Sequence, residues 1–407
     1  MTFEIALTGI NAASAELDVI SNNIANNATT GFKRSEAEFA DMYASSTLGL
    51  SNTATGSGVR VASIAQQFSQ GDISYTDNNL DLSISGEGFF RMNDNGSIVY
   101  TRSGVFSLDA EGYLVNSAGH YLTGYPADTD GNISSAISSL RLDPGDLSPQ
   151  ATSEMELGIN LDTMSEVLDP FDVNDPNTFN YSTTTTIYDS QGSAHDASIY
   201  YHMDAPNEWS SYIYVNDVEV SQAGGNQLVF NEDGTLASVN GNPETLITTN
   251  SFTPVDGTAA QTISLDFAST TQYDNPFGIN HITQNGYSTG SLEDIEIDGN
   301  GIIYGRYNNQ ESKPLGQISL TNFANPQGLR PVGETGWAET FSSGVAATGT
   351  PGSASLGLLQ SGSLEESNVD ITEELVAMIG AQRSFQANAQ VISTADTLTQ
   401  TVINIRR

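Results

Sequence analysis

The sequence contains no cysteine, which excludes disulfides, thiolate metal sites and cysteine nucleophiles. Positive charge is scarce, because 12 lysines and arginines stand against 49 acidic residues and the formal net charge is −37. A chain this acidic repels phosphate backbones and anionic lipid, so nucleic acid is not an expected partner. It also repels copies of itself. Any self-association must therefore depend on buried apolar side chains, or on salt that screens the charge.

Long apolar runs are missing as well. No stretch approaches the roughly 18 residues needed to span a bilayer, so membrane insertion is not expected. The N-terminal segment contains Glu4, Glu16 and Asp18 but no basic residue before Lys33, so the positive start of a secretory signal peptide is absent. If the protein leaves the cell, we expect an export route that does not cleave such a signal.

The N-terminal segment 3–26 is predicted to be a helix. Its apolar positions recur at alternating spacings of three and four, which is typical of a coiled-coil seam. These positions are Phe3, Ala6, Ile10, Ala13, Leu17, Ile20 and Ile24. Seven such side chains cannot readily order an isolated helix against its conformational entropy, so the helix is expected to need a partner.

A second helix is predicted at the C-terminus. Asn368 or Asp370 can cap it, and it continues to about Ile405, a length of roughly 55 Å at 1.5 Å per residue. Its apolar stripe begins with Ile371, Leu375, Met378, Phe385, Ala389 and Ile392, and then shifts to Val391, Ala395, Leu398, Val402 and Ile405. The two stripes together are the predicted polymerisation seam. The alternative is that both helices pack on the middle of the chain as ordinary amphipathic elements.

The middle of the chain, about residues 70–360, predicts β-structure. Short alternating segments are separated by turn signals such as Asp94-Asn95-Gly96 and Asp298-Gly299-Asn300-Gly301. A chain of 407 residues exceeds what one core usually supports, so two or three domains are expected. Residues 41–70 are interpreted as a connector of mixed structure. The predicted fold is therefore multidomain, with terminal α-helices forming a coiled coil and all-β middle domains.

Three motifs resemble chemical sites. Gly286–Gly290 matches the G-x-S-x-G pattern of serine hydrolases, but every histidine precedes Ser288 and a turn is the expected context. Asp128–Asn132 resembles the start of a calcium loop and lacks the remaining ligands, so turn chemistry is preferred. His195 and His202 are interpreted as structural. We expect no catalytic, cofactor or metal site, while weak divalent-cation binding by surface carboxylates stays open.

The end of the first helix carries several distinctive residues. Asn26, Gly31 and Phe32 are the predicted helix–connector junction, where glycine permits an unusual backbone angle. Lys33-Arg34 is either a contact with an acidic neighbour in an assembly or a solvated end, and both interpretations stay open. Trp209 and Trp337 are predicted core residues of separate β domains.

The two ends of the chain resemble a known family. Residues 6–13, continued by 17–26 and by Thr30-Gly31-Phe32-Lys33, are similar to the N-terminal signature of bacterial flagellar rod and hook proteins. Residues 364–370, followed by 374–376 and 381–389, resemble that family's C-terminal signature. In the middle, the segments that favour hook subunits over the shorter rod proteins are 86–90, 122–126, 188–195, 285–287 and 320–325.

The resemblance implies a structural subunit of the short curved tube that transmits motor torque from rod to filament in motility. It implies a helical polymerisation domain (1–30 and 365–407), a connector (31–70), an inner β domain (71–145 and 285–364) and an outer β domain (146–284) inserted in the inner one. The implied partners are further copies, the rod, the hook cap, the hook–filament junction proteins and the flagellar export apparatus, and the implied location is extracellular. A distal rod protein and, less favoured, a secreted β-rich adhesin are the alternatives.

Overall fold

The structure is a computed structural model, and it describes residues 2–42, 56–143, 145–255 and 257–405. The chain divides into two compact units. Unit 1 comprises Met1–Pro144, Asp294–Gly305 and Ser312–Arg407, and unit 2 comprises Gly145–Glu293 and Arg306–Glu311.

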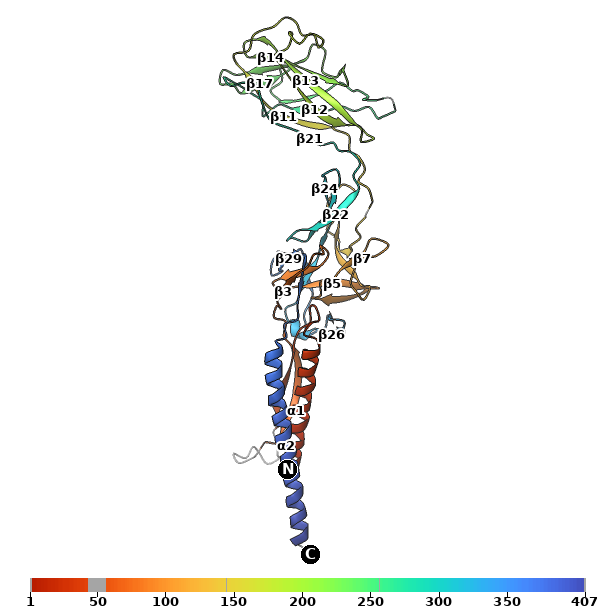
Figure 1. Ribbon diagram of the computed structural model, residues 1–407, viewed down its shortest axis with the longest axis vertical. Helices are drawn as coiled ribbons and strands as arrows, with labels where there is room; N and C mark the ends of the chain where they lie inside the picture. Colours follow the sequence, from red (N-terminus) through yellow and green to blue (C-terminus); the bar gives the residue numbers. More distant parts are fainter. Residues whose placement is uncertain (1, 43–55, 144, 256, 406–407) are drawn as a thin grey trace. The chain divides into compact units, whose positions relative to one another are not determined.

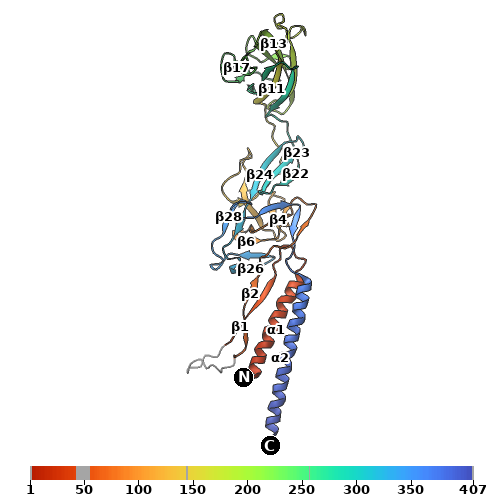
Figure 2. The same ribbon diagram turned by 90° about the vertical axis from the view of Figure 1, so that its left-hand side faces the viewer.

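Two long helices form one part of unit 1. Helix α1 spans Thr2–Ala25 and helix α2 spans Ile371–Ile405, and they lie side by side in both views (Figures 1 and 2). They run antiparallel, because Asn23 bonds to Glu374 near one end while Gly9 lies against Asn388 further along. The predicted cap is confirmed, since the Asp370 carboxylate accepts the backbone N–H of Thr372 at 2.7 Å.

The segment after α1 forms a β-hairpin where a connector of mixed structure was predicted. Strands β1 (Ser35–Asp41) and β2 (Val59–Gln66) pair antiparallel and run beside α1 (Figure 2). The Thr8 hydroxyl in α1 accepts the Val59 N–H at 3.2 Å. The hairpin is stabilised by packing on a helix, a long-range contact that local sequence does not reveal.

Among the described residues, the largest sheet has 13 strands, and its main path runs β22-β23-β24-β9-β5-β6-β27-β26. The bounds along this path are β22 Leu292–Ile297, β23 Ile302–Tyr307, β24 Ser312–Ile318, β9 Tyr121–Pro126, β5 Phe89–Asp94, β6 Ser97–Thr101, β27 Gly336–Ala338 and β26 Arg330–Gly333. The remaining strands are β7 Ser107–Leu108, β8 Leu114–Val115, β10 Ser138–Ser139, β25 Leu320–Asn322 and β28 Ala347–Gly349. A short 3₁₀ helix, η1, spans Pro326–Gly328.

Two further strand pairs lie in unit 1 outside this sheet. Strand β29 (Leu358–Ser361) pairs with β4 (Leu82–Ser85), and β30 (Ser363–Glu365) pairs with β3 (Ile73–Tyr75). The second pair directly precedes α2, so the chain enters that helix from a strand anchored in unit 1. Trp337 is buried nearby with Phe89, Tyr100 and Phe323.

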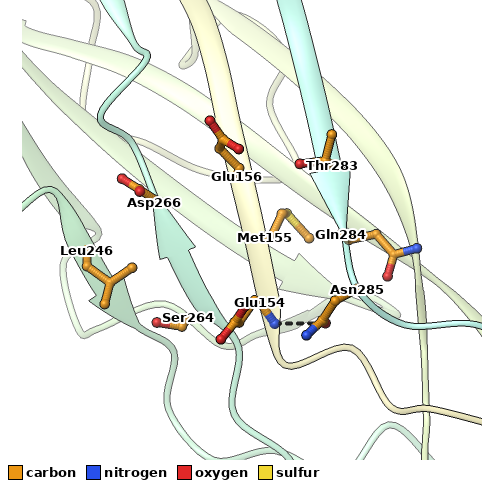
Figure 3. Close-up of a pocket in the computed structure, with 9 residues that line it drawn as sticks. All are labelled: Glu154, Met155, Glu156, Leu246, Ser264, Asp266, Thr283, Gln284 and Asn285. Atoms are coloured by element: carbon orange, nitrogen blue, oxygen red, sulfur yellow. Dashed lines mark hydrogen bonds between the residues drawn. The ribbon is translucent and has the colours of Figure 1, made fainter. Parts of the chain in front are cut away.

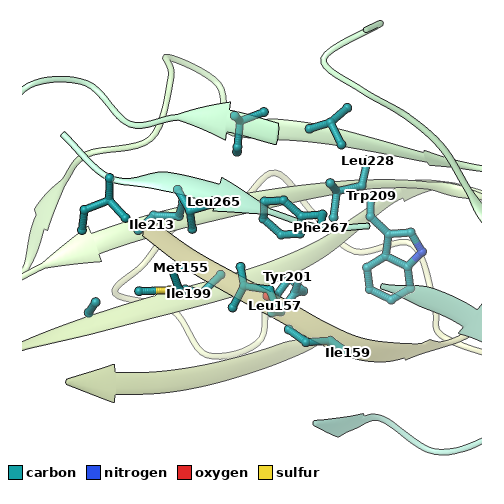
Figure 4. Packing of buried hydrophobic residues seen from close by; sticks show 14 of the residues in the cluster. Met155, Leu157, Ile159, Ile199, Tyr201, Trp209, Ile213, Leu228, Leu265 and Phe267 are labelled. Atoms are coloured by element: carbon teal, nitrogen blue, oxygen red, sulfur yellow. The ribbon is translucent and has the colours of Figure 1, made fainter. Parts of the chain in front are cut away.

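Unit 2 contains two sheets that share one core (Figure 4). The first contains β11 Glu154–Asp162, β18 Leu246–Thr248, β19 Ser264–Asp266, β20 Thr271–Tyr273 and β21 Gly278–Gln284. The second contains β12 Tyr181–Tyr188, β13 Ala194–Ala205, β14 Glu208–Val215, β15 Val218–Glu219, β16 Asn226–Phe230 and β17 Leu236–Val239. Leu157 and Leu265 from the first sheet join Ile199 and Trp209 from the second in the core. Trp209 and Trp337 therefore lie in separate cores, as predicted.

Candidate functional site

The apolar stripe of α1 is largely used within the chain. Ala6, Ala13 and Ile20 are buried, and Ile10, Leu17 and Ile24 are half-buried. Only Phe3, at the start of the helix, is half exposed, at 50%. Helix α1 packs against α2 and against the β1–β2 hairpin, and Val19 and Asn23 are buried in addition to the stripe.

The apolar stripe of α2 is mostly exposed. Ile371, Leu375, Phe385 and Leu398 are exposed, whereas Met378, Ala389 and Ile392 are half-buried. The side chains of Val402 and Ile405 lie outside the described residues. The side of α2 that packs on α1 carries Glu374, Ala381 and Asn388 instead, which are polar or small. In the second part of the stripe, Val391 is 47% exposed and Ala395 is half-buried. Outside the stripe, Val376 at 67% and Ile379 at 51% are further exposed apolar side chains of α2.

Both helices also contain long segments without acidic residues, and the α2 segment carries the single charge of Arg383. No acidic residue occurs between Leu375 and Ala395, and no charged residue occurs between Ile5 and Ala15. In a chain with a net charge of −37, these segments are the surfaces where a second copy meets the least repulsion.

A buried amide joins the two helices and the hairpin. Asn23, only 1% exposed, donates to the Ser35 carbonyl at 2.8 Å and to the Glu374 carboxylate at 3.0 Å. Its own carbonyl accepts the Ser35 N–H at 3.0 Å. Burial raises the pKa of Glu374, while the hydrogen bond from Asn23 and the charge of Arg34 oppose that rise. The Asn23 side chain in α1 therefore pairs with the backbone of Ser35 and with the carboxylate of Glu374, which links three segments. Alanine at this position would leave these buried polar groups unpaired.

A buried ionic cluster lies where the helices meet the strands of unit 1. The Glu365 carboxylate receives Lys33 Nζ at 2.5 Å, Arg102 at 3.0 Å and the Gly71 N–H at 3.0 Å. The side chains of Lys33 and Glu365 are completely buried, and that of Arg102 is 4% exposed. Burial lowers the pKa of Lys33 and of Arg102, and the Glu365 charge opposes the change in both. The cluster holds two cations and one anion away from water.

Lys33 and Arg34 bind acidic residues of their own chain, so the interpretation of this pair as a solvated end was wrong, while an assembly contact of the partly exposed Arg34 stays a prediction. Lys33 reaches Glu365 on the strand side, whereas Arg34 lies 3.1 Å from Glu373 on α2. The Arg34 N–H also donates to Asn368 at 2.7 Å. Consecutive side chains of an extended segment point to opposite sides, which is why one residue reaches each partner.

The predicted junction residues lie beside this cluster. Gly31 has φ +69°, and its N–H donates to the Glu365 carbonyl at 2.8 Å. A Cβ on Gly31 would lie 2.4 Å from the Ser103 nitrogen, so glycine is required for both reasons. Asn26 donates to the Asn22 carbonyl at 2.9 Å, and Phe32 is half-buried. Sequence reasoning identified these three residues but missed Asn23, Arg102 and Glu365, whose partners are distant in sequence.

The three chemical motifs take ordinary structural roles. Ser288 lies in an extended segment between β21 and β22 that no helix follows, so the hydrolase context is missing. The Asp128 carboxylate accepts the backbone N–H groups of Asp130 and Asn132 at 2.9 and 2.8 Å, which is a turn. His195 bonds to Asp189 at 2.9 Å and His202 to the Thr178 carbonyl at 2.8 Å.

Unit 2 has a surface hollow of about 460 Å³ over β11, β18, β19 and β21 (Figure 3). Three carboxylates line it, from Glu154, Glu156 and Asp266. The Glu154 N–H is held by the Asn285 side chain at 3.0 Å. Among the described residues, no group of three or more histidine or acidic side chains is arranged to hold a metal ion. In the same part of the chain, neither helix is long and apolar enough to cross a membrane.

Comparison with known proteins gives family matches along most of the chain. The flagella basal body rod protein matches residues 3–33, and the flagellar hook protein FlgE/F/G D1 domain matches residues 83–162. The flagellar basal body protein FlaE D2 domain matches residues 159–287. The flagellar basal body rod FlgEFG protein C-terminal family matches residues 360–405.

Three relatives are similar over almost their whole length, and each is named flagellar hook protein FlgE. That of Salmonella typhimurium is 43% identical over 421 residues, with 100% of both chains covered. That of Escherichia coli strain K12 is 41% identical over 416 residues, again with 100% of both chains covered. That of Borreliella burgdorferi is 34% identical over 439 residues, with 98% of each covered.

One solved structure is similar in fold. The crystal structure of Helicobacter pylori flagellar hook protein FlgE2 matches with a TM-score of 0.57 and 16% sequence identity. The match covers 72% of this chain and 100% of that one. At this identity the likeness concerns the fold alone.

Proposed function

The chain belongs to the flagellar hook protein family and is a structural subunit of the hook, and from this premise we propose that its copies polymerise through α1 and α2. The polymer is the short, curved, flexible tube that joins the rod to the filament and transmits motor torque. The predicted seam residues that stay exposed, on α2 and at Phe3 of α1, take part, with the exposed face of α2 as the principal contact between copies.

The observation that carries this proposal is the apolar face that α2 leaves uncovered. Leu375, Val376, Ile379 and Leu398 are each about half or more exposed, although they stand on a helix already paired with α1. Burying such a side chain contributes about 1.5–3 kcal/mol. Neighbouring helices in a tube would cover this face, and the segments of α1 and α2 that lack acidic residues allow that approach in an acidic chain.

The domain scheme is part of the same proposal. Residues 1–30 and 365–407 form the polymerising part, 31–70 the connector, 71–145 and 285–364 the inner β domain, and 146–284 the inserted outer β domain. The division of the chain near residues 145 and 293 supports the outer boundaries. In the tube, helices would hold neighbouring copies together while outer domains slide on polar contacts, so that the tube bends as it turns.

The partners and the location follow from family membership. We infer that the chain contacts the rod, the hook cap and the hook–filament junction proteins, and that the flagellar export apparatus delivers it to the extracellular hook without cleavage of a signal peptide. We also infer that it is not an enzyme and carries no cofactor. The extended setting of Ser288 supports the first point.

The test is assembly of the full-length chain after substitution on α2. Leu375→Ser combined with Val376→Ser should abolish tubes while leaving both units folded, because both side chains are exposed in the single chain. Met164→Ser is the matched control, since Met164 is 75% exposed but lies in unit 2. Tubes formed equally well by the double variant would overturn the proposal.

Truncation gives a second test, provided that the cut respects the buried cluster. A deletion from residue 365 would remove Glu365 from unit 1, so the cut is placed at Ile371. Without 1–30 or 371–407 the chain should stay monomeric. Electron micrographs of the wild type separate the alternatives: curved tubes support a hook subunit, straight tubes a rod protein, and a monomer with saturable glycan binding an adhesin.

A further inference from the structure

The buried cluster of Lys33, Arg102 and Glu365 connects segments that are far apart in sequence. Lys33 follows α1, Arg102 follows β6 in the large sheet, and Glu365 ends β30 directly before α2. Backbone groups complete the connection, because Gly31 donates to the Glu365 carbonyl and Arg102 donates to the Gly86 carbonyl at 2.9 Å. Three stretches of unit 1, at Lys33, Gly71 and Arg102, therefore converge on one carboxylate.

Close backbone contacts leave little freedom around this carboxylate. A Cβ on Gly71 would lie 2.1 Å from the Glu366 carbonyl oxygen, and one on Gly104 would lie 1.6 Å from that of Leu82. The Arg102 guanidinium also lies 5.4 Å from the centre of the Phe89 ring. A buried charge is costly unless it is paired, so each member restricts where the others can lie.

The connection continues into the helices through the next residue. Arg34 contacts Glu373 at 3.1 Å, and its N–H is fixed by Asn368, which in turn donates to the Gln67 carbonyl at 2.8 Å. The segment Lys33-Arg34 thus ties the strands of unit 1 to α2 by two adjacent ion pairs, one buried and one at the surface.

We propose that Glu365 is a positioning residue for assembly, which sets the direction in which the helix pair leaves the strands of unit 1 and thereby the geometry of the assembled tube. This inference rests on the proposed function, because it concerns the tube that the helices build. In a tube, a small change in that direction repeats at every subunit and becomes a change of twist or curvature.

The decisive variants change the buried charge in steps. Glu365→Gln keeps the shape of the side chain and leaves two unbalanced cations, whereas Lys33→Met together with Glu365→Gln returns the cluster to its original net charge. Glu366→Gln is the matched control, because Glu366 is adjacent and exposed. The measurement is the helical twist and curvature of tubes of the full-length chain by electron cryomicroscopy.

We expect Glu365→Gln to change tube geometry or abolish tubes, the double variant to move it back towards the wild type, and the control to leave it unchanged. A role in stability alone would lower the unfolding midpoint without altering the tubes that form. Tubes of Glu365→Gln with wild-type twist and curvature would overturn the inference, and so would a double variant that restores nothing.

A second measurement does not depend on assembly. In the monomer, Glu365→Gln should speed amide hydrogen exchange at Gly31 and Gly71 by about tenfold or more, because their hydrogen-bond network loses its charge. Exchange in unit 2 should not change. Unaltered exchange at both glycines would overturn the inference even where the wild type forms tubes. A wild type without tubes would overturn the proposed function instead.

Discussion

Lys33 Nζ lies 2.5 Å from Glu365 Oε1 although 332 residues separate the two in sequence. Both side chains are fully buried, and Arg102 shares the same carboxylate. The pair joins the end of the N-terminal signature of the family to the start of its C-terminal signature. Each signature therefore contributes one residue of the ion pair, Lys33 from the first and Glu365 from the second. The pair forms only when the two ends of the chain come together in folded unit 1.

The cost of removing each partner should be unequal. Lys33→Met leaves Arg102 and Glu365 as a neutral pair, whereas Glu365→Ala leaves two buried cations without the carboxylate that they share. We expect the second to destabilise unit 1 by about 3–5 kcal/mol and the first by clearly less. Urea unfolding followed by Trp337 fluorescence measures both, in a Trp209→Phe background that leaves one tryptophan in unit 1. The reverse order would contradict this account of the cluster.

Acidification should favour the helix contact at Glu374. Its pKa is raised, because burial outweighs Asn23 and Arg34, so the folded state binds a proton more readily than the unfolded state. The contribution of this group is full below its unfolded pKa and is lost as pH rises through the higher folded value. The wild type should therefore lose stability relative to Glu374→Gln between about pH 4.5 and neutrality.

Urea midpoints of both proteins across this range measure the difference. Asp18→Asn is the control, since Asp18 is an exposed acidic residue of α1 that takes no part in the Glu374 contact. A difference between wild type and Glu374→Gln that grows in favour of the wild type as pH rises would show that hydrogen bonding, and not burial, governs Glu374.

Two glycines should respond in opposite ways to alanine. Gly31→Ala forces φ +69° on a residue with a Cβ and places that atom 2.4 Å from the Ser103 nitrogen. Backbone strain alone costs about 1–3 kcal/mol, so unit 1 should be destabilised by at least that much. Gly380 stands in the interior of α2 with open space around it, and alanine there should gain about 0.5–1 kcal/mol.

Circular dichroism and thermal unfolding of the full-length chain compare the two glycine variants. A tolerated Gly31→Ala would mean that the turn after α1 relaxes without disturbing Glu365. That result would also weaken the proposed positioning role.

The buried hydroxyl of Tyr201 should be dispensable. Tyr201 is fully buried in the core of unit 2, and its hydroxyl has no hydrogen-bond partner among the described residues. Burial raises its pKa, so it stays protonated throughout the accessible pH range. Tyr201→Phe removes an unsatisfied polar group and should stabilise unit 2 by about 1 kcal/mol. Tyr200→Phe, on the half-buried opposite face, is the control, and loss of stability in Tyr201→Phe would reveal a bridging water.

Sequence periodicity predicted the elements better than it predicted their faces. Both helices, the Asp370 cap and the two tryptophan cores follow from local rules of spacing and capping. The side of α2 that packs on α1 was missed, because Glu374, Ala381 and Asn388 are polar or small and an apolar stripe does not include them. The buried roles of Lys33 and Glu365 were missed for a related reason: a charged residue is expected at the surface unless its distant partner is known.

Salt should promote assembly, and unit 2 should be the main reason. No lysine or arginine occurs between Arg141 and Arg306, so the 145–293 part of unit 2 has acidic residues without a basic one. Neighbouring copies in a tube would bring these surfaces together, and screening shortens the range of their repulsion from about 10 Å at 0.1 M salt to about 3 Å at 1 M. Polymer yield measured by sedimentation should therefore rise across this range.

Neutralising exposed acids of unit 2 by Asp217→Asn, Glu232→Gln and Glu244→Gln should make the yield at low salt higher and its salt dependence weaker. A yield that falls with salt would mean that ion pairs between copies, and not apolar burial by the helices, hold the tube together.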